Sequence, residues 1–250
     1  PQAHPVSTTR RIRLLVSVSL VIALAACESA PVPTSSPAAP GSTAAPAADA
    51  SAQPSPAAAP GHELYGFLPY WEMDDEGIAQ HVADTPLSTL ALFSVTHTAK
   101  GAINTGQRGY RLINGEVGER LIREARERGT RVELVYTSFG GPRNRKLLES
   151  DELQAKVLES LVALAADLGV DGINVDIEAL DPTLVPAFGG FVADLRAAVL
   201  AEDPGDTVSV ATGAHALGAA MAVAAASADV DRIFMMGYDY PTSRSVPGAT

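Results

Sequence analysis

The stretch that decides the fold reads Asp171-Gly-Ile-Asn-Val-Asp-Ile-Glu178. Alternate side chains of an extended strand share a face, so Asn174, Asp176 and Glu178 project to one side and the β-branched residues between them to the other. The stretch lies between two helical patterns, where parallel strands are usually covered on both faces. Burying a row that ends in two carboxylates is unfavourable unless the row does chemistry. Glu178 also falls at the carboxyl end of the strand, where α/β barrels place their catalytic residues.

The first 27 residues are typical of a targeting signal rather than of a folded domain. Three arginines precede an apolar run, residues 14–26, that is too short to span a bilayer comfortably. The run ends in Leu24-Ala-Ala-Cys27, which resembles a bacterial lipobox, so we expect Cys27 to carry lipid after cleavage. The alternative is a plain secretory signal with an incidental cysteine.

Residues 28–61 are nearly all Ala, Pro, Ser, Thr and Gly. Such a stretch cannot bury enough apolar surface to offset its ordering entropy, so we predict a disordered tether. Cys27 is the only cysteine, which excludes an internal disulfide. The lipobox and the tether together predict an extracytoplasmic protein that is anchored to the cell membrane, with its folded domain in residues 62–250.

The charge and the histidine pattern exclude several classes of partner. The formal net charge is −11 at pH 7, and such a field repels the phosphate backbones of nucleic acids. A neutral polysaccharide remains an acceptable partner. The histidines are isolated and no Gly-x-Gly-x-x-Gly motif occurs, so we expect neither a metal nor a cofactor.

Strand and helix patterns alternate from His62 onward. The predicted strands are Leu64–Trp71, Thr89–Thr96, Arg131–Phe139, Gly169–Ile177, Thr207–Gly213 and Arg232–Tyr238; the clearest predicted helices are Ser150–Leu168 and Pro182–Leu200, with shorter ones ending at Gly129 and over Ala214–Ala228. Repeated βα units predict a parallel sheet, either doubly wound or closed into a barrel. Because a complete barrel needs eight units, the alternatives are a barrel that lacks its last two units and a complete six-stranded open sheet.

Three further motifs lie at predicted strand ends: Gly66-Phe-Leu-Pro-Tyr-Trp71, Ser138-Phe-Gly-Gly141 and Met236-Gly-Tyr-Asp239. With the stretch Asp171–Glu178, they resemble the ordered signature motifs of glycoside hydrolase family 18, the chitinase-like enzymes. The resemblance implies a TIM (β/α)8 barrel, of which this chain contains about the first six βα units. It therefore also implies a C-terminally truncated sequence.

The resemblance implies a role for each acidic and phenolic side chain of these motifs. Glu178 would be the general acid that protonates the glycosidic oxygen, and the substrate's own 2-acetamido oxygen would be the nucleophile. Asp176 would orient the acetamido N–H, and Tyr238 would hydrogen-bond the acetamido carbonyl. Asp239 would support the site from beside it. The implied substrates are β-1,4-linked polymers that contain N-acetylglucosamine, either chitin or peptidoglycan, cleaved with retention by a monomeric enzyme.

Other residues near the predicted strand ends are candidate substrate contacts. Trp71 and Tyr70 are either core or rim aromatics or sugar-stacking faces, and Met236 and Tyr136 are expected to line the cleft. Asn174 stands where the family usually has aspartate. Asn at this position resembles the bacterial spore-cortex and peptidoglycan-lytic branch, and the side chain can still donate a hydrogen bond through its amide.

Two hypotheses from other classes stay open beside a glycosidase. The first is a catalytically weak or inactive carbohydrate-binding lipoprotein of the same family, although lectin-like members commonly lose the acidic Glu that this chain keeps as Glu178. The second is an unrelated α/β scaffold of the envelope, which would require all four motif matches to be accidental.

Overall fold

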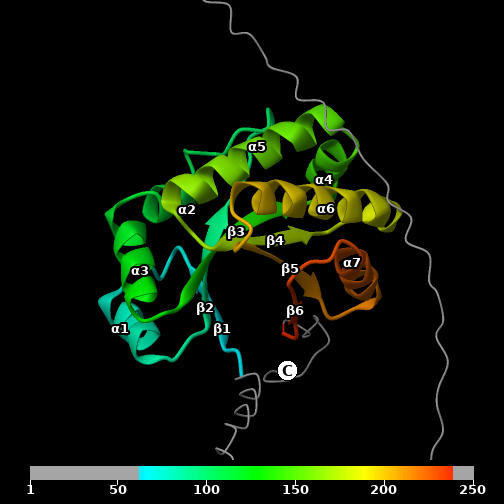
Figure 1. The fold of residues 1–250 in the computed structure, drawn as a ribbon. Helices are drawn as coiled ribbons and strands as arrows, with labels where there is room; N and C mark the ends of the chain where they lie inside the picture. Colours follow the sequence, from blue (N-terminus) through cyan, green and yellow to red (C-terminus); the bar gives the residue numbers. More distant parts are fainter. Residues whose placement is uncertain (1–61, 239–250) are drawn as a thin grey trace, which may run out of the picture. The chain divides into compact units, whose positions relative to one another are not determined.

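The structure is a computed structural model that describes residues 62–238. The predicted signal peptide, Cys27, the tether and Asp239 lie outside these residues. The described residues form one parallel sheet in the order β1-β2-β3-β4-β5-β6 (Figure 1). Its strands are Tyr65–Pro69, Thr89–Val95, Arg131–Phe139, Gly172–Glu178, Thr207–Gly213 and Arg232–Met236. Each strand pairs with its neighbour in sequence, as in successive βα units of a barrel.

Helices connect the strands and cover the outer face of the curved sheet (Figure 1). They are α1 (Glu76–Asp84), α2 (Arg108–Ile113), α3 (Glu116–Glu127), α4 (Gly141–Leu148), α5 (Asp151–Leu168), the short 3-10 helix η1 (Pro182–Leu184), α6 (Val185–Glu202) and α7 (Ala216–Ser227). The predicted helices correspond to α3, α5, α6 and α7. Sequence periodicity missed α1, α2 and α4, which are short and have few buried apolar positions.

Helix α5 shows how the sequence sets both the ends and the face of an element. The hydroxyl of Ser150 accepts a hydrogen bond from the backbone N–H of Leu153 at 3.2 Å, which caps the first turn. Gly169 ends the helix in the left-handed conformation, at φ 64°. Between these residues, Val157 and Leu161 lie on the face of α5 that is turned toward the sheet, and both are fully buried.

Helix α6 is long and apolar enough to cross a membrane by length and composition. However, Phe188, Phe191 and Leu195 on this helix are fully buried in the domain core. We therefore interpret α6 as a core helix that covers the sheet.

Strand β4 is covered on both faces, as its position between two helical patterns predicts. Ile173 and Val175 are fully buried and Ile177 nearly so, and these side chains belong to the core between the sheet and the helices. On the other face, Asn174 and Asp176 are also buried. At the start of the strand, the carboxylate of Asp171 accepts a hydrogen bond from the backbone N–H of Val132 at 2.7 Å, which ties β4 to β3.

The curvature of the sheet brings side chains on the inner faces of β1 and β6 into contact. The ring centroids of Phe67 on β1 and Phe234 on β6 are 4.9 Å apart, and Tyr65 lies 5.1 Å from Phe67. The guanidinium of Arg232 binds both carboxylate oxygens of Glu63, at 2.7 and 2.8 Å. Side chains that point inward from different strands therefore meet on the concave face of the sheet.

Candidate active site

The two carboxylates of β4 differ sharply in their surroundings. Asp176 is only 4% exposed, whereas Glu178, at the end of the strand, is exposed. Burial and the nearby charge of Glu178 raise the pKa of Asp176 from 3.8 to about 7. Asp176 can therefore exchange a proton near neutral pH, in the range that acid–base catalysis uses.

A cleft of about 800 Å³ opens above these carboxylates at the carboxyl edge of the sheet. Its lining comes from β1, β2, β3, β5 and β6 as well as β4, and it is mostly apolar and aromatic: Phe67, Pro69, Trp71, Phe93, Phe139, Ala211, Gly213, Ala214, His215, Phe234, Met236 and Tyr238 surround Asp176 and Glu178. Such a wall suits the apolar faces of sugar rings, while the carboxylates supply the polar groups that orient a ligand.

The backbone beside Glu178 is held by the loop that leaves β3. Asn144 of α4 is fully buried, and its amide nitrogen donates a hydrogen bond to the Glu178 carbonyl at 2.5 Å. The hydroxyl of Ser138 donates to the other end of the same amide at 2.7 Å. The N–H of Gly140 also points to the Glu178 carbonyl, at 3.3 Å, with a φ of 101° that favours glycine. These contacts fix the position from which the Glu178 side chain enters the cleft.

The structure brings three other predicted residues to the cleft. Trp71, 51% exposed, Tyr238, 57% exposed, and Met236 all line it. Tyr70 does not line the cleft and packs partly buried behind Trp71, with their ring centroids 5.0 Å apart and nearly perpendicular. Tyr70 therefore fits the first alternative, a core or rim aromatic that supports its neighbour. Trp71 presents an accessible ring, as a sugar-stacking face requires.

Tyr136 lies outside the cleft, contrary to the sequence prediction. Its side chain is 0% exposed, on the outer face of β3, where the ring lies 6.2 Å from that of Phe191. Its hydroxyl hydrogen-bonds Nδ1 of His97 at 2.7 Å. Burial lowers the pKa of His97 to about 4, so this ring is neutral, and its tautomer sets which of the two groups donates. Nearness to a strand end was misleading because the side chain points to the helices.

Asn174 also lies below the cleft rather than in its wall. It is fully buried, and its amide nitrogen donates to the hydroxyl of Ser209 on β5 at 2.6 Å. Oδ1 of Asn174 and Oδ1 of Asp176 are both buried with no hydrogen-bond partner among residues 62–238. Asn174 is therefore not placed to contact a substrate in the cleft directly.

Sequence reasoning missed several residues that line the cleft. Phe93 and Phe139 sit at the ends of β2 and β3, and their inward direction follows from strand alternation once the register is known. His215 lines the cleft and caps α7, since its Nδ1 accepts from the N–H of Gly218 at 3.1 Å. In the described part of the chain, no group of three or more His, Cys, Asp or Glu side chains is placed to hold a metal ion.

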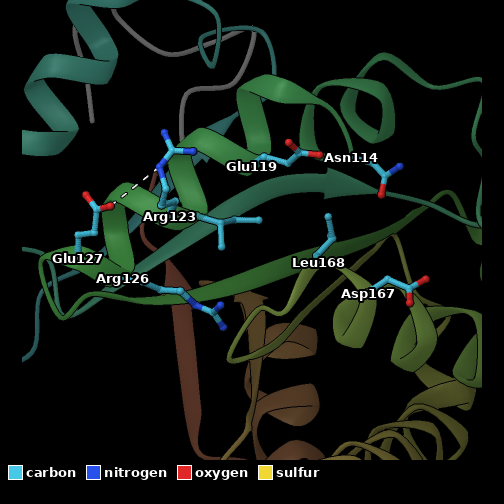
Figure 2. Close-up of a pocket in the computed structure, with 8 residues that line it drawn as sticks. Asn114, Glu119, Arg123, Arg126, Glu127, Asp167 and Leu168 are labelled. Atoms are coloured by element: carbon cyan, nitrogen blue, oxygen red, sulfur yellow. Dashed lines mark ion pairs between the residues drawn. The ribbon is translucent and has the colours of Figure 1, made fainter.

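A second hollow, of about 480 Å³, lies between α3 and the end of α5 (Figure 2). Its walls combine Arg123, Arg126, Glu127 and Asp167, and Arg123 pairs with Glu127 at 4.0 Å. Arg126 also donates to the backbone carbonyl of Gly169, just before β4, so this hollow lies near the amino edge of the sheet. Residues at that edge of a barrel usually serve stability, whereas the carboxyl edge carries catalysis.

Comparisons with known proteins agree with this geometry. The sequence profile of Glycosyl hydrolases family 18 matches residues 64–250. No curated protein matches the sequence significantly. Among solved structures, the spore cortex-lytic enzyme SleL of Bacillus cereus is similar with a TM-score of 0.59 at 20% identity, over 71% of this chain and 41% of that chain.

Two chitinases are also similar. A chitinase from Bacteroides thetaiotaomicron has a TM-score of 0.57 at 16% identity, over 74% of this chain and 57% of that one. A class V chitinase from Pseudomonas fluorescens has a TM-score of 0.57 at 21% identity, over 71% of this chain and 54% of that one. This chain thus spans between 41% and 57% of these three structures. The likeness confirms the predicted fold class, a partial TIM barrel of about six βα units.

Proposed function

Because the chain belongs to glycosyl hydrolase family 18, we propose that the whole protein hydrolyses β-1,4 bonds in polysaccharides that contain N-acetylglucosamine. One observation carries the proposal: a buried carboxyl group, Asp176, lies directly beneath an exposed one, Glu178, in an aromatic cleft at the carboxyl edge of the sheet. This arrangement supplies an acid–base group with access to substrate and a second carboxyl group beside it.

In the proposed reaction, Glu178 gives its proton to the glycosidic oxygen as the bond to the anomeric carbon breaks. The substrate's acetamido oxygen forms the new bond to that carbon, and an oxazolinium-like intermediate results. Water then attacks the anomeric carbon, and Glu178 takes the proton that this water releases, which restores the enzyme. Asp176 accepts the acetamido N–H as a hydrogen bond and stabilises the positive charge that develops there.

The distribution of acids supports an acetamido nucleophile. Among the described residues that line the cleft, the carboxylates are Asp176 and Glu178, and both belong to β4. A retaining enzyme with its own nucleophile needs a second carboxylate roughly 5 Å from the acid, on the other side of the scissile bond. No described residue supplies a carboxylate from a facing strand. Tyr238, at the cleft wall, is the proposed partner of the acetamido carbonyl.

We favour peptidoglycan over chitin as the substrate. Support comes from Asn174, which stands in the place of the usual aspartate. Asn at this position resembles the peptidoglycan-lytic branch of the family. Trp71 and Phe139, both about half exposed in the cleft, are the proposed stacking faces for the sugar rings.

The test uses the full-length protein with purified peptidoglycan, chitin oligosaccharides and two variants. Glu178→Gln keeps the size of the side chain but removes the acid, and we expect product release to fall by a factor on the order of 100 or more. Glu202→Gln changes an exposed acid on α6 and should leave the rate unchanged. Equal rates for wild type and Glu178→Gln would exclude Glu178 as the acid. Glycan binding by the wild type without any product would favour the carbohydrate-binding alternative.

We also propose that Cys27 anchors the protein to the outer face of the cell membrane. Support comes from the basic, apolar and Leu-Ala-Ala-Cys order of residues 10–27 and from the Pro-rich segment that follows. Labelling with a radioactive fatty acid and membrane fractionation test this, with Cys27→Ala as the variant. Equal labelling of the variant would contradict the assignment.

A further inference from the structure

A buried network of polar side chains lies beneath the cleft, centred on Glu133 of β3. Glu133 is 0% exposed. Its carboxylate accepts hydrogen bonds from the hydroxyls of Tyr65 at 2.6 Å, Thr207 at 2.9 Å and Ser209 at 2.5 Å. The guanidinium of Arg232 lies 3.9 Å away. Donors from β1, β5 and β6 thus converge on one carboxylate that the proposed reaction does not use.

The chemistry of these groups fixes the direction of the next hydrogen bond. A carboxylate has only acceptors, so Ser209 uses its single hydroxyl hydrogen on Glu133. The Ser209 oxygen must then accept from Asn174, whose amide nitrogen is 2.6 Å away. The oxygen and nitrogen of a side-chain amide are often interchangeable in a structure, but here the hydrogen bond to Ser209 fixes which atom of Asn174 is the nitrogen. The carbonyl oxygen of Asn174 therefore points away from Ser209.

Asp176 is the next buried side chain after Asn174 on the same face of β4. The two side chains share a face of β4, two residues or roughly 6.5 Å apart along the strand. Oδ1 of each is buried without a partner among the described residues. An acceptor held at Asn174 can receive a hydrogen bond from Asp176 only when Asp176 is protonated. Burial and the charge of Glu178 raise the pKa of Asp176 to about 7, so a further change in this pKa falls in a range that a titration can follow.

We propose that Glu133 is a positioning residue of the active site: through Ser209 it holds the Asn174 amide with its carbonyl toward Asp176, and so favours the protonated form of Asp176 before substrate arrives. The inference rests on the proposed function, in which Asp176 receives the acetamido group. The proposal also gives Asn174 a role. The negative charge of Glu133 lies on the neighbouring strand β3, two residues before the level of Asn174, and the hydrogen bonds through Ser209 and Asn174 transmit its effect to Asp176.

The titratable and charged side chains that face the network or the cleft above it are Tyr65 of β1, Glu178 of β4, Arg232 of β6 with its partner Glu63, and His215 at the start of α7. Burial and the charge of Glu133 raise the pKa of Tyr65, so this phenol remains a donor. The hydrogen bond to Glu63 raises the pKa of Arg232, which remains a cation. Neither group changes its charge in the range where Asp176 titrates.

The test measures the pKa of Asp176 in the full-length protein by carbon NMR of labelled aspartate carboxyls. In Glu133→Gln, the introduced amide can donate to Ser209, whose hydroxyl then turns toward Asn174. The Asn174 amide reverses and offers an N–H to Asp176, which stabilises the charged form. We expect the pKa of Asp176 to fall by about one unit, a tenfold lower proton affinity.

Two further variants separate this relay from a simple loss of charge. Ser209→Ala keeps the Glu133 charge but breaks the chain, so it should also lower the pKa of Asp176. Thr207→Val removes a hydrogen bond to Glu133 but leaves the chain intact, so the pKa should stay unchanged. A fall in Glu133→Gln alone, equal falls in all three variants, or no fall in Ser209→Ala would each overturn the proposal. The NMR titration needs no turnover, so it tests the role of Glu133 independently of the hydrolysis assay. Failure of the hydrolysis assay would reject the proposed function, and the titration would still decide whether Glu133 positions Asn174.

Discussion

The buried carboxyl group of Asp176 should make the stability of the protein depend on pH. Its pKa rises from 3.8 to about 7 in the folded state, so the native protein binds this proton more tightly than the unfolded chain does. The stability that the proton contributes is complete below about pH 3.8 and is lost as the pH rises to about 7. At about 1.4 kcal/mol for each pKa unit, the loss approaches roughly 4 kcal/mol.

Asp176→Asn removes the titrating group and keeps the shape of the side chain. Near pH 4 we expect the variant to be about as stable as the wild type, or slightly less stable. Near pH 8 we expect it to be more stable by about 2–4 kcal/mol, because the wild type then buries a charge. Hydrolysis should be lost at both values, since Asn cannot stabilise the developing positive charge of the acetamido group.

Urea denaturation of the full-length protein, at several values between about pH 4 and 8, measures this difference. Asp194→Asn provides the matched control, because Asp194 is exposed on α6, and its free energy of unfolding should follow the wild type. Parallel curves for the wild type and Asp176→Asn across the whole range would refute the reasoning. Such curves would mean that Asp176 titrates alike in the folded and unfolded chains.

Three further substitutions probe the surroundings of the two carboxylates. Asn144→Ala removes a buried amide that holds the Glu178 carbonyl, so urea denaturation should show a loss of about 1–3 kcal/mol, and kcat should fall as well. Trp71→Ala should raise KM for an oligosaccharide about fivefold, for a lost stacking contact of about 1 kcal/mol, with kcat little changed. Tyr136→Phe leaves His97 without its hydroxyl partner and should lower stability by about 1 kcal/mol. Because Tyr136 lies outside the cleft, an altered KM in that variant would contradict the placement.

Much of the fold could be predicted from local sequence. The alternation in β4 predicted a strand with a polar inner face, and the structure buries both faces. Helix α5 was predicted almost to the residue, because Ser150 caps it, an apolar stripe runs through it and Gly169 ends it. These signals lie within one element, where periodicity and capping chemistry are sufficient.

The rest depends on contacts that no local pattern reveals. Tyr136 was placed in the cleft because it lies near a strand end, but alternation from Glu133 puts Val135 and Thr137, not Tyr136, on the inner face. The partners of Glu133 are likewise remote: Tyr65 and Ser209 lie 68 and 76 positions away in the sequence. A lone Glu in an apolar strand gives no sign of hydroxyls that arrive from two other strands.

The contact between Glu63 and Arg232 has a consequence for how the protein is made. These residues are 169 positions apart, so at about 5–20 residues per second the ribosome needs roughly 10–30 s to supply the second after the first. During that interval, β1 can pair with β2, but its aromatic side chains have no Phe234 to pack against. Synthesis therefore leaves Tyr65 and Phe67 in contact with water or a chaperone until β6 emerges. A slowed translation rate after β5 should increase aggregation of the nascent chain, and Arg232→Ala should increase it further.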